Sequence, residues 1–260
     1  MPQVEQFRRD QRPADVPIWL ETLVGLDWLA LRMSPVWFGY GVRHGNREPV
    51  VLVPGFLGTD GYLWELYAWL RRMGYRPYMS EIGRNADCLE LLMARLLRRI
   101  ETARDETGRK VHVIGHSLGG MLARSAATLR SESVASVVSL GSPFRGVRSH
   151  PFVLAAAARV RRRIHLNRAD GPPRCYTGHC GCATTEALGA AFPASIPQIA
   201  IYTRTDGIVD WRVCVNDDPA TNVEVPGTHI GLAFNPFAYR AIATHLASAT
   251  EGVPTASRRV

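Results

Sequence analysis

The sequence lacks the features that would assign it to a membrane-spanning, nucleic-acid-binding or modular class. Its most apolar stretch is interrupted by charges and a proline, so we expect no helix that crosses a bilayer, which needs about 20 mostly apolar residues. Residues 1–15 are polar and carry no apolar signal core, which favours a cytoplasmic location. No recognised nucleic-acid module, repeat or linker is present. We therefore expect one domain without a nucleic-acid partner.

Lysine is nearly absent, and arginine carries almost all of the basic excess behind the net charge of +8. A basic balance can steer anionic substrates or hold a protein near an anionic membrane surface. The densest arginine cluster lies within residues 159–168. A solvated helix face is the first interpretation of this cluster, and a contact with lipid or an acidic ligand is the second.

Cysteine is scarce, and three of the five cysteines form a cluster, Cys175, Cys180 and Cys182, with His179 beside them. An odd count leaves at least one thiol unpaired in a monomer. The spacing is tighter than in the paired Cys-x2-Cys knuckles that bind zinc. We rank plain thiols first, a disulfide within the cluster or to Cys214 second, and zinc third.

The length of 260 residues and the 46% hydrophobic content suit one large α/β domain with a substantial core. Continuous apolar runs at 49–53 and 134–140 are typical of strands buried on both faces of a parallel sheet. Residues 86–104 repeat apolar side chains with a helical period, with Asn85 as the N-cap. Further strands are predicted at 76–82, 198–202 and 222–225, and further helices at 61–73 and 236–247. This alternation predicts a three-layer fold with a mostly parallel central sheet.

One short stretch organises the rest of the chain. A strand at 110–114 meets residues 115–119, Gly-His-Ser-Leu-Gly, and a helical run at 121–129 follows. Gly-x-Ser-x-Gly between a strand and a helix is a nucleophile elbow, whose serine sits in a strained turn. The glycines are needed because a Cβ there would meet the neighbouring strand and helix. The N-terminus of the helix presents free N–H groups that suit an oxyanion near Ser117.

A serine hydroxyl is a weak nucleophile and needs a base and an orienting carboxylate. Among eight histidines we choose His229, in the loop after the last predicted strand, whereas His116 should point away and be structural. The loop after Tyr202 offers two carboxylates, Asp206 and Asp210. We assign Asp206 as the acid because it lies at the catalytic edge of the sheet. Asp210 is assigned as the N-cap of the helical segment that follows.

The chain order Ser117, Asp206, His229 is that of the α/β-hydrolases rather than of chymotrypsin or subtilisin. With its Gly-His-Ser-x-Gly-Gly elbow, the chain resembles α/β-hydrolase fold esterases and lipases, most of all bacterial lipases, over residues 49–247. The resemblance implies cleavage of carboxylic esters, lipid-like or otherwise acyl, through an acyl-enzyme on Ser117, with no metal or other cofactor. An acyltransferase with the same three residues and a non-catalytic binding protein of this fold are the alternatives.

The resemblance also implies an oxyanion hole made by the backbone N–H groups of Phe56 and Leu118. The family usually has His-Gly after its third strand, where this chain has Pro54-Gly55. The support of this loop must therefore differ, although backbone donors do not depend on the missing histidine side chain.

A cap or lid is predicted at about 144–192, because the strand–helix alternation breaks after the strand at 134–140. By resemblance that strand is the sixth of the family, and the loop at 141–146 resembles the one that follows it in lipases. We expect apolar residues such as Phe152, Val153 and Leu154 to face the substrate.

The chain divides into an N-terminal tail with an apolar helical segment, the hydrolase domain with its cap, and a C-terminal tail, at residues 1–48, 49–250 and 251–260. The stretch Ile18–Phe38 contains three tryptophans and, read as a helix, has a thin polar stripe through Glu21, Gly25 and Arg32. We expect it to pack on the domain's own sheet. A peripheral membrane contact and a subunit interface are the alternatives.

Overall fold

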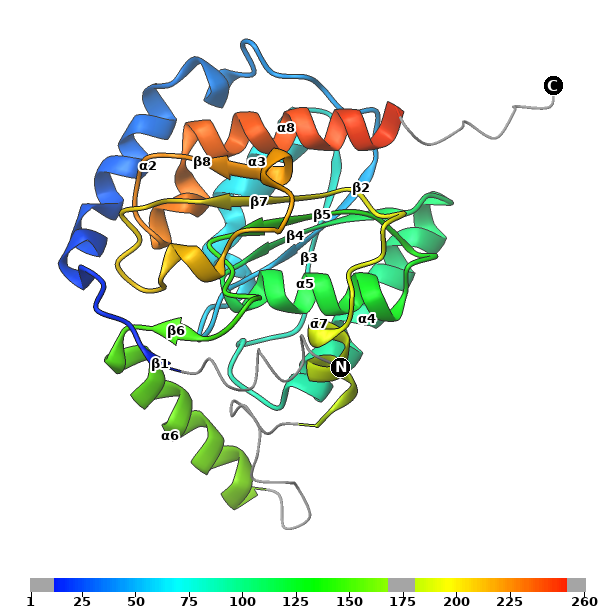
Figure 1. Cartoon of the computed structure of the whole chain (residues 1–260). Helices are drawn as coiled ribbons and strands as arrows, with labels where there is room; N and C mark the ends of the chain where they lie inside the picture. Colours follow the sequence, from blue (N-terminus) through cyan, green and yellow to red (C-terminus); the bar gives the residue numbers. More distant parts are fainter. Residues whose placement is uncertain (1–11, 168–180, 252–260) are drawn as a thin grey trace.

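The computed structural model describes residues 12–167 and 181–251. A six-stranded sheet lies at the centre of these residues, with helices on both faces (Figure 1). The strands are β2 (Pro49–Val53), β3 (Arg76–Met79), β4 (Val111–His116), β5 (Val134–Leu140), β7 (Gln198–Tyr202) and β8 (Asn222–Glu224). Their order in space is β3-β2-β4-β5-β7-β8, and every pairing is parallel. The predicted parallel sheet is therefore confirmed.

Two helices cover each face of the sheet. On one side lie α3 (Trp64–Arg72) and α8 (Pro236–Glu251), and on the other α4 (Leu89–Thr107) and α5 (Leu118–Leu129) (Figure 1). Each side buries its own apolar cluster against the sheet. The three-layer arrangement expected from the alternation is therefore confirmed, and it brings the carboxyl ends of all six strands to one edge.

Two predicted boundaries around α4 are wrong. Asn85 does not cap this helix, since α4 begins at Leu89 and its N-cap residue is Cys88. The preceding strand ends at Met79 rather than at residue 82, because the backbone turns left-handed at Glu81, with φ of 56°. Residues between the strand and the helix form a loop, and this loop supports the site described below.

The segment between β5 and β7 interrupts the alternation, as the sequence indicated. It contains β6 (Arg148–Ser149), α6 (Pro151–Asn167) and α7 (Ala183–Gly189). The strand β6 pairs with β1 (Arg12–Pro13) in a separate two-stranded sheet. Among the described strands, β5 is the fourth of the central sheet in chain order rather than the sixth. The two N-terminal strands usual in the resembled family are not among the described residues.

The cysteine cluster lies mostly outside the described residues, which exclude Cys175, His179 and Cys180. Cys214 is a buried free thiol, and burial raises its pKa well above the ordinary value, with a further contribution from Asp206 and Asp210. The disulfide to Cys214 that the sequence left open is therefore not formed.

The apolar N-terminal stretch forms three short helices rather than one. They are the 3₁₀ helix η1 (Ile18–Leu23), α2 (Val24–Met33) and the 3₁₀ helix η2 (Pro35–Phe38). They pack on the domain mainly through α8 and the 3₁₀ helix η6 (Ile230–Phe234), and their buried apolar residues belong to the apolar cluster on this face of the sheet. No helix in the described ranges is long and apolar enough to cross a membrane.

Candidate active site

Ser117 occupies the sharp turn between β4 and α5. Its backbone has φ 53° and ψ −122°, a strained conformation for a residue with a side chain. A Cβ at Gly119 would lie 2.2 Å from the carbonyl oxygen of Val53, and one at Gly115 would lie 2.3 Å from the Gly119 backbone. The elbow glycines are therefore required by close approach of strand and helix, as the sequence predicted.

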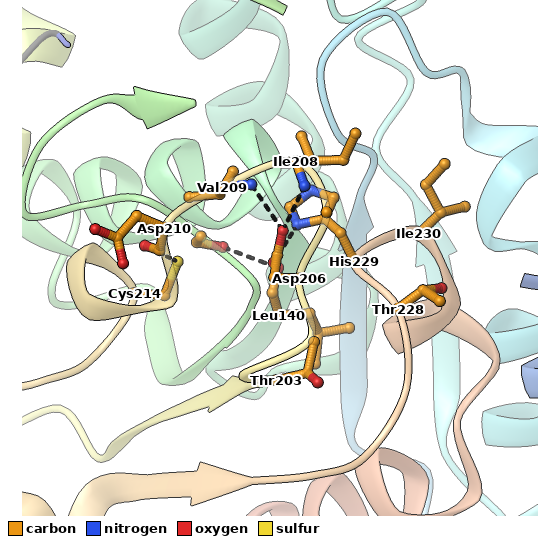
Figure 2. Close-up of polar contacts among 12 residues, drawn as sticks. Leu140, Thr203, Asp206, Ile208, Val209, Asp210, Cys214, Thr228, His229 and Ile230 are labelled. Carbon is orange, nitrogen blue, oxygen red and sulfur yellow. Dashed lines mark hydrogen bonds and ion pairs between the residues drawn. The ribbon is translucent and has the colours of Figure 1, made fainter. Parts of the chain in front are cut away.

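The structure joins Asp206 to His229 in a buried pair. Oδ2 of Asp206 lies 2.6 Å from Nδ1 of His229, and both side chains are almost fully buried (Figure 2). The other carboxylate oxygen accepts the backbone N–H groups of Ile208 and Val209 at 2.9 and 2.7 Å. A carboxylate held in this way places the ring proton on Nδ1 and leaves Nε2 as a proton acceptor.

Asp210 lies apart from this pair. Figure 2 shows its carboxylate turned away from His229. Its side chain accepts the backbone N–H of Arg212 at 3.1 Å, as the N-cap of the 3₁₀ helix η4 (Trp211–Val213). The structure therefore gives Asp210 the capping position that the sequence predicted.

The electrostatics of His229 combine two opposed effects. Burial alone would lower its pKa, because an imidazolium loses water there. The charge of Asp206, the hydrogen bond to it and the charge of Glu21 act in the other direction. They prevail, and the pKa of His229 is raised above its ordinary value.

Ser117 and His229 lie at the same edge of the sheet, in the elbow after β4 and the loop after β8. The ring of His116, next to Ser117, lies 4.9 Å from the ring of His229, centroid to centroid. Within the described part of the chain, the Ser117 hydroxyl makes no hydrogen bond. Contacts between a nucleophile and its base are often loose without substrate and tighten when it binds.

The loop at 54–58 is held by Asn85, a residue that is fully buried. Its side-chain amide donates to the carbonyl of Pro54 at 2.7 Å. Its backbone carbonyl accepts the N–H of Leu57, and its backbone N–H donates to Gly58, both at 2.9 Å. Asn85 therefore gives this loop the support that the missing family histidine cannot.

The fold is shared with known hydrolases. The structure resembles the monoglyceride lipase of Saccharomyces cerevisiae with a TM-score of 0.57 and 13% identity, over 80% of this chain and 90% of that one. The chain has the α/β-hydrolase fold. The monoacylglycerol lipase of Paleococcus ferrophilus aligns with a TM-score of 0.52 and 20% identity, over 80% and 97% of the two chains. Residues 92–174 match the family model described as alpha/beta hydrolase fold.

Part of the sequence is similar to triacylglycerol lipases. The chain is 31% identical over 140 residues to a triacylglycerol lipase of Burkholderia plantarii, covering 50% of this chain and 39% of that protein. It is 33% identical over 131 residues to a triacylglycerol lipase of Vibrio cholerae, covering 45% and 42%. The chain thus spans about two fifths of the length of these relatives.

Ser117 opens on a cavity of about 310 Å³. Phe56 and Leu118, the residues expected to form the oxyanion hole, line it beside Ser117. From α6 it receives the predicted residues Val153 and Leu154. The remaining lining is mostly apolar and comprises Leu89, Met121, Leu122, Ser125, Pro143, Val147, Ser149, Ala157, Ala158, Arg161, Thr184, Thr185, Leu188, Ile208 and Val209.

The prediction that Phe152 lines the cavity is wrong. The arginines of α6 also differ from one another in their surroundings. Phe152 does not line the cavity and is 72% exposed, because it lies on the opposite side of the first turn of α6. Arg161 lines the cavity, and Arg163 donates to the carbonyl of Ala86 at 2.7 Å. A solvated face therefore does not describe every arginine of this helix.

Two carboxylates of the N-terminal stretch contact the loop of His229 without having been predicted to do so. Glu21, placed on a polar stripe by the helical pattern, is buried with 8% exposure and contacts the loop of His229. Asp27 accepts the backbone N–H and the hydroxyl of Thr228 at 3.1 and 2.8 Å. The available signal was the presence of two acidic residues in an otherwise apolar run.

Among the described residues, no group of three or more His, Cys, Asp or Glu side chains could hold a metal ion.

Proposed function

We propose that this chain is a serine hydrolase that cleaves carboxylic esters through an acyl-enzyme on Ser117. The observation that carries the proposal is the buried Asp206–His229 pair, at the same sheet edge as the elbow serine and its apolar cavity. The lipase relatives support an ester as the substrate. The mostly apolar lining supports an acyl group as the part that enters the cavity.

In the first half of the reaction, Ser117 Oγ attacks the ester carbonyl carbon while Nε2 of His229 takes the hydroxyl proton. The carbonyl electron pair moves onto oxygen, and the oxyanion faces the backbone N–H groups of Phe56 and Leu118. Donors of this kind contribute about 3–4 kcal/mol each to the transition state. When the carbonyl re-forms, the alcohol leaves with the proton from His229.

In the second half, water replaces the alcohol. His229 takes a proton from water, the hydroxide attacks the acyl carbon, and a second oxyanion forms in the same place. Its collapse releases the carboxylic acid, and the proton on His229 returns to Ser117. Throughout, the carboxylate of Asp206 stabilises the imidazolium without itself taking a proton.

The cavity volume of about 310 Å³ lies at the lower end of the range for small-molecule sites. It suits one acyl chain better than a whole multi-chain lipid. We therefore place the acyl chain along α6, beside Val153 and Leu154, and the alcohol toward solvent. The cap assignment for residues 144–192 stays part of this proposal.

The test is hydrolysis of p-nitrophenyl esters of graded chain length by the whole chain, with and without vesicles. We expect turnover, and labelling of Ser117 by a fluorophosphonate. Product analysis with an added alcohol acceptor separates hydrolysis from acyl transfer, since a transferase would form the new ester in preference to the acid. Absence of both turnover and labelling would instead favour a binding protein of this fold.

The N-terminal stretch supports a peripheral contact with a lipid surface. Seven of its large apolar side chains are at least 41% exposed, namely Trp19, Leu23, Leu26, Trp28, Leu29, Met33 and Phe38. Arg32 stacks on Trp28 and Trp37, at 5.1 and 4.5 Å from the ring centroids. Tryptophan and arginine together suit the boundary between headgroups and acyl chains.

The membrane contact is tested with anionic and zwitterionic phospholipid vesicles. The double variant Trp19→Ser, Met33→Ser should lose vesicle binding while keeping turnover of a soluble ester. The control is Leu166→Ser, because Leu166 is 75% exposed like Met33 but lies on α6, well separated from α2 (Figure 1). Equal binding by the wild type and the double variant would reject the contact.

A further inference from the structure

The carboxylate of Glu21 connects the two loops that carry Asp206 and His229. Oε1 accepts the backbone N–H of Gly207, 186 residues along the chain, at 2.9 Å. The same oxygen accepts the N–H of His229 at 2.9 Å, and Oε2 accepts the N–H of Ile230 at 2.9 Å. One side chain from the N-terminal stretch therefore touches both the residue after the acid and the base itself.

These contacts explain how an acidic side chain is tolerated at 8% exposure. A buried carboxylate without partners is costly, but three N–H donors replace the water it has lost. Hydrogen bonds to a charged group are also stronger than neutral ones. The same contacts hold the two loops at a fixed separation.

The loops are shaped for this approach. A Cβ at Gly207 would lie 2.9 Å from Oε1 of Glu21 and 2.7 Å from the carbonyl of Pro17. A Cβ at Gly231 would lie 1.9 Å from Oδ2 of Asp27. The glycines beside the acid and the base are therefore the places where the N-terminal carboxylates come close.

The backbone of His229 is held on its other side as well, since its carbonyl accepts a hydrogen bond from Nε2 of His116 at 2.9 Å. With Asp206 on the ring and Glu21 on the N–H, the base is fixed at three points. Removing Glu21 would release only the backbone N–H of His229, while Asp206 and His116 would still hold its ring and its carbonyl.

We propose that Glu21 is a positioning residue, which sets the separation of Asp206 and His229 and the direction of the imidazole toward Ser117. It acts through the backbone and does not reach the substrate. The inference rests on the proposed ester hydrolysis. It makes the N-terminal stretch a part of the active site.

Loss of Glu21 should lower the pKa of His229 both through the geometry of the loops and through the missing charge. Burial lowers the pKa of His229, while the charges of Asp206 and then Glu21 raise it. Because catalysis needs the neutral imidazole, kcat/KM rises with pH through this pKa. Loss of the Glu21 charge, or drift of Asp206 away from the ring, therefore moves the midpoint of that rise to lower pH.

The experiment compares Glu21→Gln with Asp27→Asn, measuring kcat/KM for a soluble short-chain ester across the pH range. Asp27 contacts Thr228 on the same loop but touches neither Gly207 nor the backbone of His229. We expect Glu21→Gln to lower the plateau by up to about 100-fold, the effect of a small misplacement, and to move the midpoint to lower pH. We expect Asp27→Asn to keep the wild-type midpoint.

The proposal requires that Glu21→Gln lower both the plateau of kcat/KM and the midpoint of its pH profile. A wild-type midpoint in Glu21→Gln, or a wild-type plateau, would overturn the proposal, and so would the same shift in Asp27→Asn. If Glu21→Gln does not fold, Glu21→Asp replaces it, since aspartate keeps the charge but is too short to reach both loops. A wild-type plateau in folded Glu21→Asp would overturn the proposal equally.

A readout without substrate separates this proposal from the proposed function. NMR titration of the His229 ring in the whole protein reports its pKa directly, in the wild type and in Glu21→Gln. A wild type without esterase activity would reject the ester hydrolase, while a lower pKa of His229 in the variant would still support the contact with Glu21. If the wild type is an active esterase and the pKa of His229 is unchanged in Glu21→Gln, the role of Glu21 is rejected and the proposed ester hydrolysis is not.

Discussion

Nε2 of His116 lies 2.9 Å from the carbonyl oxygen of His229, which joins the elbow to the loop of the base. Burial lowers the pKa of His116 to about 3, and the nearby His229 acts in the same direction. The imidazole therefore stays neutral at physiological pH, and its Nε2–H donates to the carbonyl. The sequence predicted a structural histidine here, and this bond supplies its structural role.

Replacement of His116 by phenylalanine keeps a ring in the elbow but removes the donor. The buried carbonyl of His229 then keeps only the long contact with the N–H of Leu232, at 3.4 Å, which should cost about 1–3 kcal/mol of unfolding free energy. Denaturant unfolding measures this loss, and kcat should fall because the loop of His229 is less fixed. Wild-type stability together with wild-type kcat would contradict the assignment.

The two aspartates after β7 should respond differently to amidation. Asp206→Asn should reduce kcat by about 10⁴-fold, the scale of the same change in a serine protease triad, because the wrong tautomer of His229 is favoured. Asp210→Asn is the matched control, and it should retain most activity since asparagine also caps helices. Steady-state kinetics of both variants, with circular dichroism to verify folding, decide between them. The reverse pattern would transfer the role of acid to Asp210.

The pH dependence of kcat/KM should follow the protonation of His229. Its raised pKa predicts an acid limb whose midpoint lies above the ordinary imidazole value of about 6.5. The same shift stabilises the fold at low pH, where the imidazolium is present, and this contribution is lost as pH rises through the folded-state pKa. Kinetics and thermal unfolding over one pH series measure both. A midpoint below the ordinary value would contradict the description of the site.

The cavity should set the preference for acyl chain length. Leu154→Trp should reduce kcat/KM for long-chain p-nitrophenyl esters far more than for the acetate, because the larger side chain occupies space beside Ser117. Phe152→Trp is the control, since Phe152 is exposed and outside the lining. A change of preference in the control, or none in Leu154→Trp, would place the acyl chain elsewhere.

The sequence carried enough information for the sheet and for the main site residues. Apolar runs defined the strands, and Ser117, Asp206 and His229 follow strand ends, where the parallel topology brings distant residues together. These predictions need only local patterns and one topological rule. The position of Asp210 could likewise be predicted because capping depends on the next turn of the chain.

Glu21 and Asn85 could not be predicted in the same way. Both act by hydrogen bonds to backbone groups of distant loops, and no side-chain pattern encodes such partners. The helical pattern placed Glu21 on a polar stripe. Such a pattern does not show that the loops of Asp206 and His229 cover this side of the segment. The position of Phe152 was predicted wrongly because the sequence does not show which side of the first turn of α6 faces the cavity.

Covalent labelling by a fluorophosphonate, read by intact-protein and peptide mass spectrometry, tests most directly whether Ser117 is the nucleophile. One adduct should form in the wild type, on the peptide that contains Ser117, and the Ser117→Ala variant should form none while folding normally. Ester hydrolysis should fall in parallel by about 10⁶-fold, as for loss of a serine nucleophile elsewhere. A folded Ser117→Ala variant that still forms the adduct or hydrolyses esters at the wild-type rate would contradict the account.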